Sequence, residues 1–118
     1  MISTMHYKVL ISGAGIFFEN YTQEEPFIGF VACRIIQAHD EELAIATAKR
    51  DILVNWNQSL NADRKLGMPL LTVELVEPVR SWLKPKIKHD YYWFANEADK
   101  QQQLEKFTRP PSVWFWRN

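Results

Sequence analysis

The chain has 118 residues, of which 47% are hydrophobic and 24% charged, and its 14 basic and 14 acidic side chains leave no net charge. This composition excludes a globally disordered chain, argues against a polyanion-binding protein, and suits a single domain spanning 1–118 with a sizeable core. The single cysteine excludes an intrachain disulfide. The sequence has neither a leader pattern nor an apolar run of roughly 18 residues, so we expect a cytoplasmic protein with no membrane segment.

The first predicted strand covers 5–12 and runs into a glycine pair, Gly13 and Gly15. A strand followed by glycines imitates the start of a dinucleotide-binding fold, but the third glycine of that pattern falls at Phe18. Residues 19–26 also lack the apolar stripe of a helix. We therefore reject a cofactor site here and predict a bulge or turn, followed by a long connection to an antiparallel second strand.

Residues 28–79 form the central unit of the prediction. Residues 28–37 and 70–77 alternate with the period of two that is typical of strands, whereas 40–57 carries a helical apolar stripe of Ile45, Ala48, Ile52 and Trp56. Asp40 is the predicted N-cap of that helix. If the two strands are neighbours, the helical crossover makes them parallel.

The predicted fold class is α+β, a two-layer sandwich. Thr72 and Glu74 share one face of the third strand, which suggests that this face of the sheet meets water. A second helix is predicted over 96–107 and a last, aromatic strand over 112–117. The prediction is a mixed sheet of four to five strands with two helices, in the ferredoxin-like order β-β-α-β-α-β.

The last third of the chain combines basic and aromatic side chains. Residues 1–78 hold ten acids and six bases, whereas residues 79–118 hold four acids and eight bases. Cations beside aromatic rings are typical of single-stranded nucleic acid binding, but lysines and a proline also protect a sheet edge. The predicted interaction surface consists of Trp82, Lys84, Lys86, Lys88, Tyr92, Trp93, Trp114 and Trp116.

No catalytic, cofactor-binding or metal-binding residues are predicted. Cys33 lies in the middle of a strand and is interpreted as a small buried hydrophobic residue. The two His-Asp pairs, at 39–40 and 89–90, lack the spacing of metal ligands, so the first is interpreted as a helix cap and the second as a turn.

Several short motifs carry a resemblance to a known group of proteins. They are the glycines and Phe17-Phe18 after the first strand, Gly29-Phe30, residues 37–44, Gly67-Met68-Pro69 and residues 71–77. Over residues 5–80 the chain resembles a group of small bacterial proteins of unassigned function with a ferredoxin-like α+β arrangement. Relative to that group, residues 84–107 look like an insertion, and the resemblance implies no catalytic residues.

Three functions are compatible with these patterns. The favoured hypothesis is a small non-catalytic interaction module, of adaptor or immunity type, that binds another protein or itself as a homodimer. The second is single-stranded nucleic acid binding through residues 80–94. The third is a small-molecule or enzymatic pocket between helix and sheet, with His6, Glu74 or His89 as polar groups.

Overall fold

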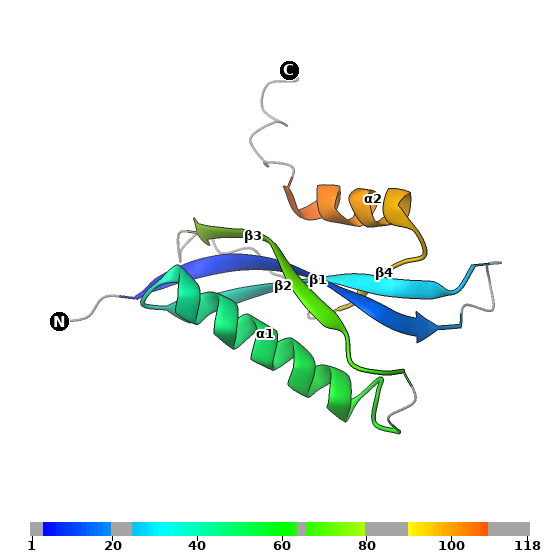
Figure 1. Cartoon of the computed structure of the whole chain (residues 1–118). Helices are drawn as coiled ribbons and strands as arrows, with labels where there is room; N and C mark the ends of the chain where they lie inside the picture. Colours follow the sequence, from blue (N-terminus) through cyan, green and yellow to red (C-terminus); the bar gives the residue numbers. More distant parts are fainter. Residues whose placement is uncertain (1–3, 20–24, 64–65, 80–89, 109–118) are drawn as a thin grey trace, which may run out of the picture.

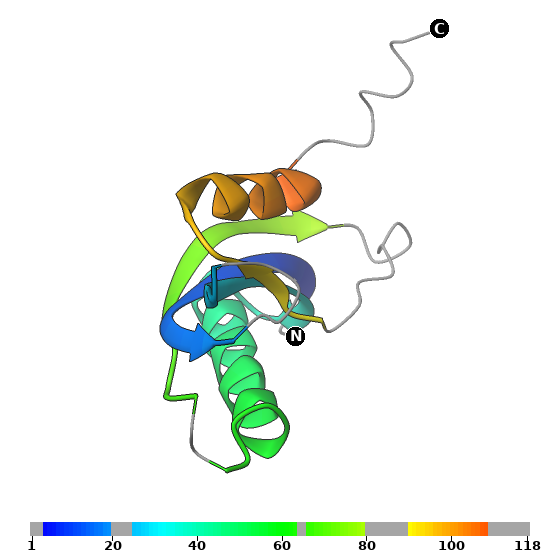
Figure 2. The same cartoon turned by 90° about the vertical axis from the view of Figure 1, so that its right-hand side faces the viewer.

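The computed structural model describes residues 4–19, 25–63, 66–79 and 90–108. Its elements, in chain order, are β1 (Met5–Phe18), β2 (Phe27–Ala38), α1 (Glu41–Gln58), β3 (Leu70–Val79), β4 (Tyr92–Phe94) and α2 (Glu97–Thr108). The strands form one sheet in the order β3-β1-β2-β4, and each pairing in it is antiparallel. Helix α1 lies against one face of the sheet and α2 against the other (Figures 1 and 2). The α+β class is therefore confirmed.

The predicted arrangement of the sheet is wrong in three respects. The strands of the central unit, β2 and β3, are not neighbours, because β1 lies between them and pairs with both. The sheet of the described residues is antiparallel rather than mixed, and its order is not ferredoxin-like. The helices also cover opposite faces, which makes three layers instead of two (Figure 2). Periodicity reports which face of a strand is buried, but it does not report which strands are adjacent.

Strand β1 is longer than the predicted strand over 5–12. It continues through the glycines to Phe18, with an irregularity in its pairing between Ala14 and Phe18, and Gly15 has a positive φ of 79°. The rejection of a dinucleotide-binding turn is confirmed, since the glycines lie inside a hairpin strand rather than between a strand and a helix. The predicted last strand, 112–117, lies outside the described residues, and β4 was not predicted as a strand.

Helix α1 matches its sequence pattern closely. The backbone N–H of Leu43 donates to Asp40 Oδ1 at 2.8 Å, so the predicted N-cap is confirmed. The buried face consists of Ala44, Ala48, Ile52 and Trp56. Trp56 Nε1 donates to the Gly67 carbonyl at 2.8 Å, which ties the end of the helix to the connection that leads into β3.

Both faces of the central strands are buried. Under α1, the predicted inward residues Tyr7, Val9 and Ile11 pack with alternate residues of β2 and with the apolar stripe of the helix. On the opposite face, under α2, a smaller cluster contains Leu10, Val31, Cys33 and Phe94. The prediction that Cys33 is buried is confirmed.

Two glycines of the hairpin make room for aromatic rings on the neighbouring strands. Gly13 lies opposite Phe30, and a Cβ atom at position 13 would lie 2.4 Å from Phe30 Cζ. Gly29 lies opposite Phe94, and a Cβ atom there would lie 2.3 Å from Phe94 Cζ. Each ring therefore covers a glycine across the strand pair, and a Cβ atom at either position would force a shift of the packed ring.

Gly13→Ala should lower the free energy of unfolding by about 2 kcal/mol, because the new methyl group overlaps the Phe30 ring in a packed core. The cost should fall below about 1 kcal/mol in a Phe30→Leu background, since the smaller side chain vacates that space. Urea denaturation of the two single variants and the double variant measures this coupling. Ala14→Ser, at an exposed neighbouring position, serves as the control. Equal costs in both backgrounds would contradict the steric explanation.

Candidate binding groove at the edge of the sheet

A groove of about 430 Å³ lies where β4, at one edge of the sheet, meets α2. Four aromatic side chains and three polar ones line it: Phe27, Tyr91, Tyr92, Trp93, Asp99, Gln102 and Gln103. The aromatic residues come from the start of β2, from β4 and from the residue before it, and the polar residues come from α2, where Gln102 is exposed and the other two are partly buried. The groove therefore has one aromatic and one polar wall.

Trp93 is the centre of the aromatic wall. Phe18, Phe27 and Tyr91 stack on it, with ring centroids 4.9, 5.9 and 5.6 Å from its own. Trp93 also meets Phe30 edge-on at 6.1 Å. Because Phe30 belongs to the core cluster under α1, the aromatic wall is a continuation of that core and is held in one orientation.

Tyr91 is fixed by the helix below it and by a buried cation. Its hydroxyl group donates to Asn55 Oδ1 at 2.6 Å, on α1. Arg34, only 2% exposed, donates to the Cys33 carbonyl at 3.0 Å. Burial raises the pKa of Tyr91, while the charge of Arg34 acts in the opposite direction. Burial likewise lowers the pKa of Arg34, against the charges of Tyr91 and Asp51.

The polar wall is set by the first turns of α2. Asn96 Oδ1 accepts from the Asp99 backbone N–H at 2.9 Å, which caps the helix, and Asp99 Oδ2 accepts from the Ala95 N–H at 3.2 Å. Gln103 Nε2 donates to the Trp93 carbonyl at 3.1 Å, so a side chain of α2 forms a hydrogen bond with the backbone of the edge strand. Among the described residues the buried Gln103 Oε1 has no hydrogen-bond partner.

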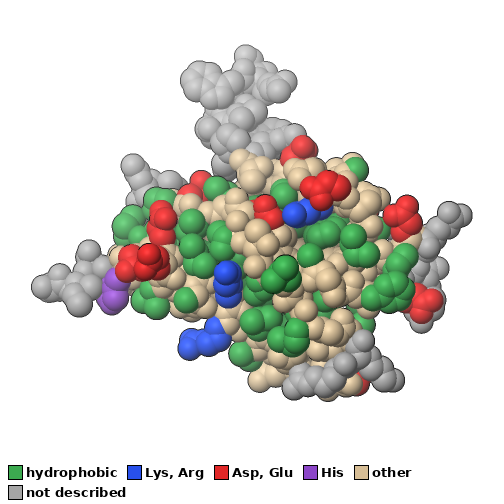
Figure 3. Space-filling view, viewed as in Figure 1, with side chains coloured by type: hydrophobic (Ala, Val, Ile, Leu, Met, Phe, Trp, Pro, Cys, Tyr) green, Lys and Arg blue, Asp and Glu red, His purple; other side chains and the backbone are tan. Residues whose placement is uncertain are grey.

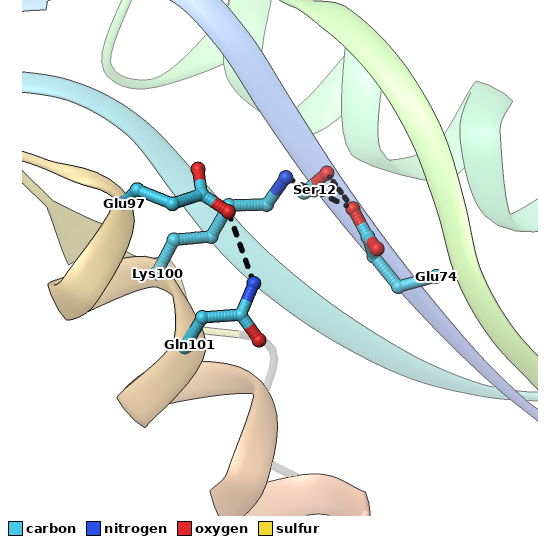
Figure 4. Close-up of polar contacts among 5 residues, drawn as sticks. All are labelled: Ser12, Glu74, Glu97, Lys100 and Gln101. Carbon is cyan, nitrogen blue, oxygen red and sulfur yellow. Dashed lines mark hydrogen bonds and ion pairs between the residues drawn. The ribbon is translucent and has the colours of Figure 1, made fainter.

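A polar chain on the sheet holds α2 in place (Figure 4). The Ser12 hydroxyl group donates to Glu74 Oε2 at 2.6 Å, and Lys100 Nζ lies 3.3 Å from the same oxygen. Lys8 contacts both Glu77 on β3 and the Phe107 carbonyl at the end of α2. A cation at the last carbonyls of a helix is favourable, and these contacts anchor α2 at both ends.

The two edges of the sheet differ in what protects them. At β4, the Gln103 amide group donates a hydrogen bond to the Trp93 carbonyl. At β3, the pairing with β1 is interrupted between Leu10 and Ile11, and Pro78 lies near the end of the strand. Hydrophobic side chains are visible on the face that β3 crosses, between α1 and α2 (Figure 3). Irregular pairing and proline are both common protections of an edge strand.

Only Tyr92 and Trp93 of the predicted interaction surface lie among the described residues, and both line the groove. They point to opposite faces of β4, because Trp93 joins the aromatic stack whereas Tyr92 meets Phe107 edge-on at 5.1 Å. The other predicted surface residues lie outside the described residues: Trp82, Lys84, Lys86, Lys88, Trp114 and Trp116.

The polar groups proposed for a pocket between helix and sheet are not brought together. His6 pairs with Val79 at one end of β1, whereas Glu74 lies against Ser12, six residues further along that strand. Six strand residues span about 20 Å. His89 lies outside the described residues, and the space under α1 is occupied by Ile52, Trp56 and the side chains around them.

Sequence reasoning missed the polar wall of the groove. Asp99 and Gln103 are four residues apart, so they share one face of a helix, and Asn96 precedes Asp99 by three, as in a capping motif. This spacing could have identified a polar face on α2. That this face lies beside β4 depends on contacts between residues that are distant in the sequence.

Glu74→Ala should lower the free energy of unfolding by about 1–3 kcal/mol, because it leaves the buried Ser12 hydroxyl group without an acceptor. Glu74→Gln retains an acceptor and should cost less. Lys100→Met removes only a partly exposed ion pair and should cost less than about 1 kcal/mol. Chemical denaturation gives all three values. If Lys100→Met lowered the free energy of unfolding as much as Glu74→Ala does, the ion pair rather than the hydrogen bond would be the stabilising contact.

Cys33 should resist alkylation in the native protein at pH 8 and react only on unfolding, because it is fully buried and burial raises the pKa of its thiol group from 9.0 to about 11. The neutral thiol favours the folded state. Its contribution to stability is complete below pH 9 and is lost as the pH rises towards 11. A Cys33→Ala variant should therefore lose less stability than the parent over this range. Rapid alkylation of the folded protein would contradict this result.

No helix formed by the described residues is both long and apolar enough to cross a membrane. Comparison of the chain with protein-family models, with curated proteins and with solved structures found no match.

Proposed function

We propose that this chain is a small, non-catalytic interaction module that binds a protein segment in the groove between β4 and α2. The observation that carries this proposal is the meeting of an aromatic wall and a polar wall at a sheet edge. Aromatic residues are enriched in protein interfaces, and polar groups at the rim of a groove fix the orientation of a ligand. Tyr92 and Trp93, expected from the sequence to belong to an interaction surface, lie in this groove.

The chemistry of the described residues favours binding over catalysis. Asp99 is the one ionisable carboxylate in the lining, and it already accepts a backbone N–H. The Ser12 hydroxyl group is buried and bound to Glu74, and the Cys33 thiol group is buried and neutral. General acid–base or nucleophilic catalysis requires an accessible nucleophile beside a base, and these groups do not supply that pair.

A protein partner fits the groove better than single-stranded nucleic acid. Base stacking requires free aromatic faces, whereas three rings of the chain itself stack on Trp93. Phosphate groups require cations, whereas Asp99 places a negative charge in the lining, which contains no lysine, arginine or histidine. The basic residues 84–88, which motivated the nucleic acid hypothesis, lie outside the described residues.

The partner is another protein or a second copy of this chain. A second copy would make a homodimer, and light scattering of the purified protein at low and high salt distinguishes these two cases. We also propose a cytoplasmic location, where a free cysteine such as Cys33 is ordinary.

Phage-displayed peptides selected on the immobilised protein should bind the groove and lose affinity when it is blocked. Gln102 is an exposed lining residue, and Gln102→Arg places a bulky cation in the groove without removing a hydrogen bond found among the described residues. We expect Gln102→Arg to weaken the selected peptides at least about tenfold, which corresponds to about 1.4 kcal/mol. Fluorescence anisotropy of labelled peptides measures the change.

Gln101→Arg is the matched control, because it makes the same chemical change one residue earlier on α2 and outside the lining. Its affinity for the peptides should stay within about twofold of the parent chain, well inside the energy of one good contact. Equal binding by the parent and both variants, or a failure to enrich any peptide, would contradict the proposed function.

A further inference from the structure

We infer that β3, at the edge of the sheet opposite the groove, pairs antiparallel with β3 of a second copy of this chain. A two-fold axis through Thr72 relates the copies and joins their two four-stranded sheets into one continuous sheet. This inference goes beyond the proposed function, because it leaves the groove at β4 free for another protein.

The first half of β3 is a regular strand with an unpaired outer side. On its inner side, residues from Leu70 to Val73 pair in unbroken order with β1. Among the described residues no strand lies on the outer side, since β3 is last in the strand order. The two protections of this edge come later in the strand, because the irregular pairing follows Val73 and Pro78 is near the end. The backbone of residues 70–73 is therefore available to another strand.

The side chains of this half are uncharged and mostly apolar. Leu71 and Val73 pack partly on the core cluster under α1. Leu70 is 74% exposed, the highest fraction among the large hydrophobic side chains of the described residues, and Met68 just before the strand is also exposed. Lysines commonly block an edge strand, whereas β3 contains neither lysine nor arginine. The edge therefore has the character of an interface.

The charges of β3 favour a second copy as the partner. Its two carboxylates already have partners in the same chain: Glu74 lies 3.3 Å from Lys100, and Glu77 lies 3.1 Å from Lys8. Two identical edges always bring identical charges together, so self-pairing requires an edge without unpaired charge. The edge of β3 meets this requirement among the described residues, and it offers no unpaired charge to an oppositely charged segment of another protein.

The register follows from the limits of the regular half. With the axis at Thr72, this residue lies opposite its own copy, and Leu71 lies opposite Val73 of the second copy on the α1 face of the sheet. An axis at Glu74 would place two carboxylates opposite each other. An axis at Leu71 would bring Pro69, which has no N–H group, into the ladder. An axis at Val73 would carry the ladder across the irregular pairing.

Sedimentation equilibrium of the full chain, from about 1 µM to about 1 mM, measures the dimer. The parent chain should dimerise in this range. Thr72→Lys should weaken the dimer at least about tenfold, because two ammonium groups would lie opposite each other across the axis. Thr72→Val keeps the shape of the side chain and should retain the dimer. Thr72 is exposed, and circular dichroism reports whether each variant is folded.

A charge exchange tests the register itself. Thr72→Glu alone should weaken the dimer as Thr72→Lys does, but an equimolar mixture of the two variants should restore it, because opposite charges then meet across the axis. This rescue requires position 72 of one copy to lie beside position 72 of the other. Gln102→Lys is the matched control, since it places the same charge in the groove at the other edge and should change the dimer by less than about twofold.

A parent chain that stays monomeric at about 1 mM, a dimer that survives in Thr72→Lys, or a mixture that does not reassociate would each overturn the inference. A dimer that is lost in Gln102→Lys but kept in Thr72→Lys would also overturn it, by placing the second copy in the groove. Selected peptides that bind a monomeric parent chain but not Thr72→Lys would overturn it in favour of a strand from another protein. The proposed function fails by a different result, unchanged peptide binding by Gln102→Arg, so the two claims fail separately.

Discussion

The contact between the Phe30 ring and the backbone of Gly13 is the constraint on which the rest of the structure depends. Because Gly13 has no side chain, the Phe30 ring occupies the space beside it and contacts three other rings. Its centroid lies 5.4 Å from that of Trp56 on α1, 4.8 Å from that of Tyr91 and 6.1 Å from that of Trp93. One residue of a central strand thus joins the helix, the core and the edge strand.

The same constraint explains why a groove exists at one edge of the sheet. Trp93 is oriented by Phe30 from inside and by Phe18 and Phe27 from the hairpin end, so the short strand β4 presents fixed rings. Gly29, which makes room for Phe94, allows the same strand to anchor its other face in the cluster under α2. A three-residue strand has few hydrogen bonds of its own, and these rings supply the rigidity that its ladder lacks.

Helix α2 contributes polarity rather than core. None of its residues is buried, and it is held to the sheet by Lys100 on Glu74 and by Lys8 at its last turn. These contacts and one partly buried stripe attach α2 to the sheet. The other side chains of its first turns are accessible. Asp99 and Gln102 therefore line the groove from the α2 side of the sheet edge.

Local features of the chain were accessible from the sequence. The boundaries of α1 and its Asp40 cap, the burial of Cys33 and the inward face of Tyr7, Val9 and Ile11 follow from periodicity and capping, which depend on neighbours within a few residues. These features depend on interactions between residues that are close in the sequence, and such interactions can be read from the sequence.

The sequence by itself determined the α+β class and most of the elements. Only the tertiary structure decided that β1 lies between β2 and β3, that the helices cover opposite faces and that Asp99 and Gln102 line the same groove as Trp93. Strand order and helix side depend on packing between residues tens of positions apart. Single contacts such as that of Phe30 with Gly13 decide among arrangements that have the same local pattern.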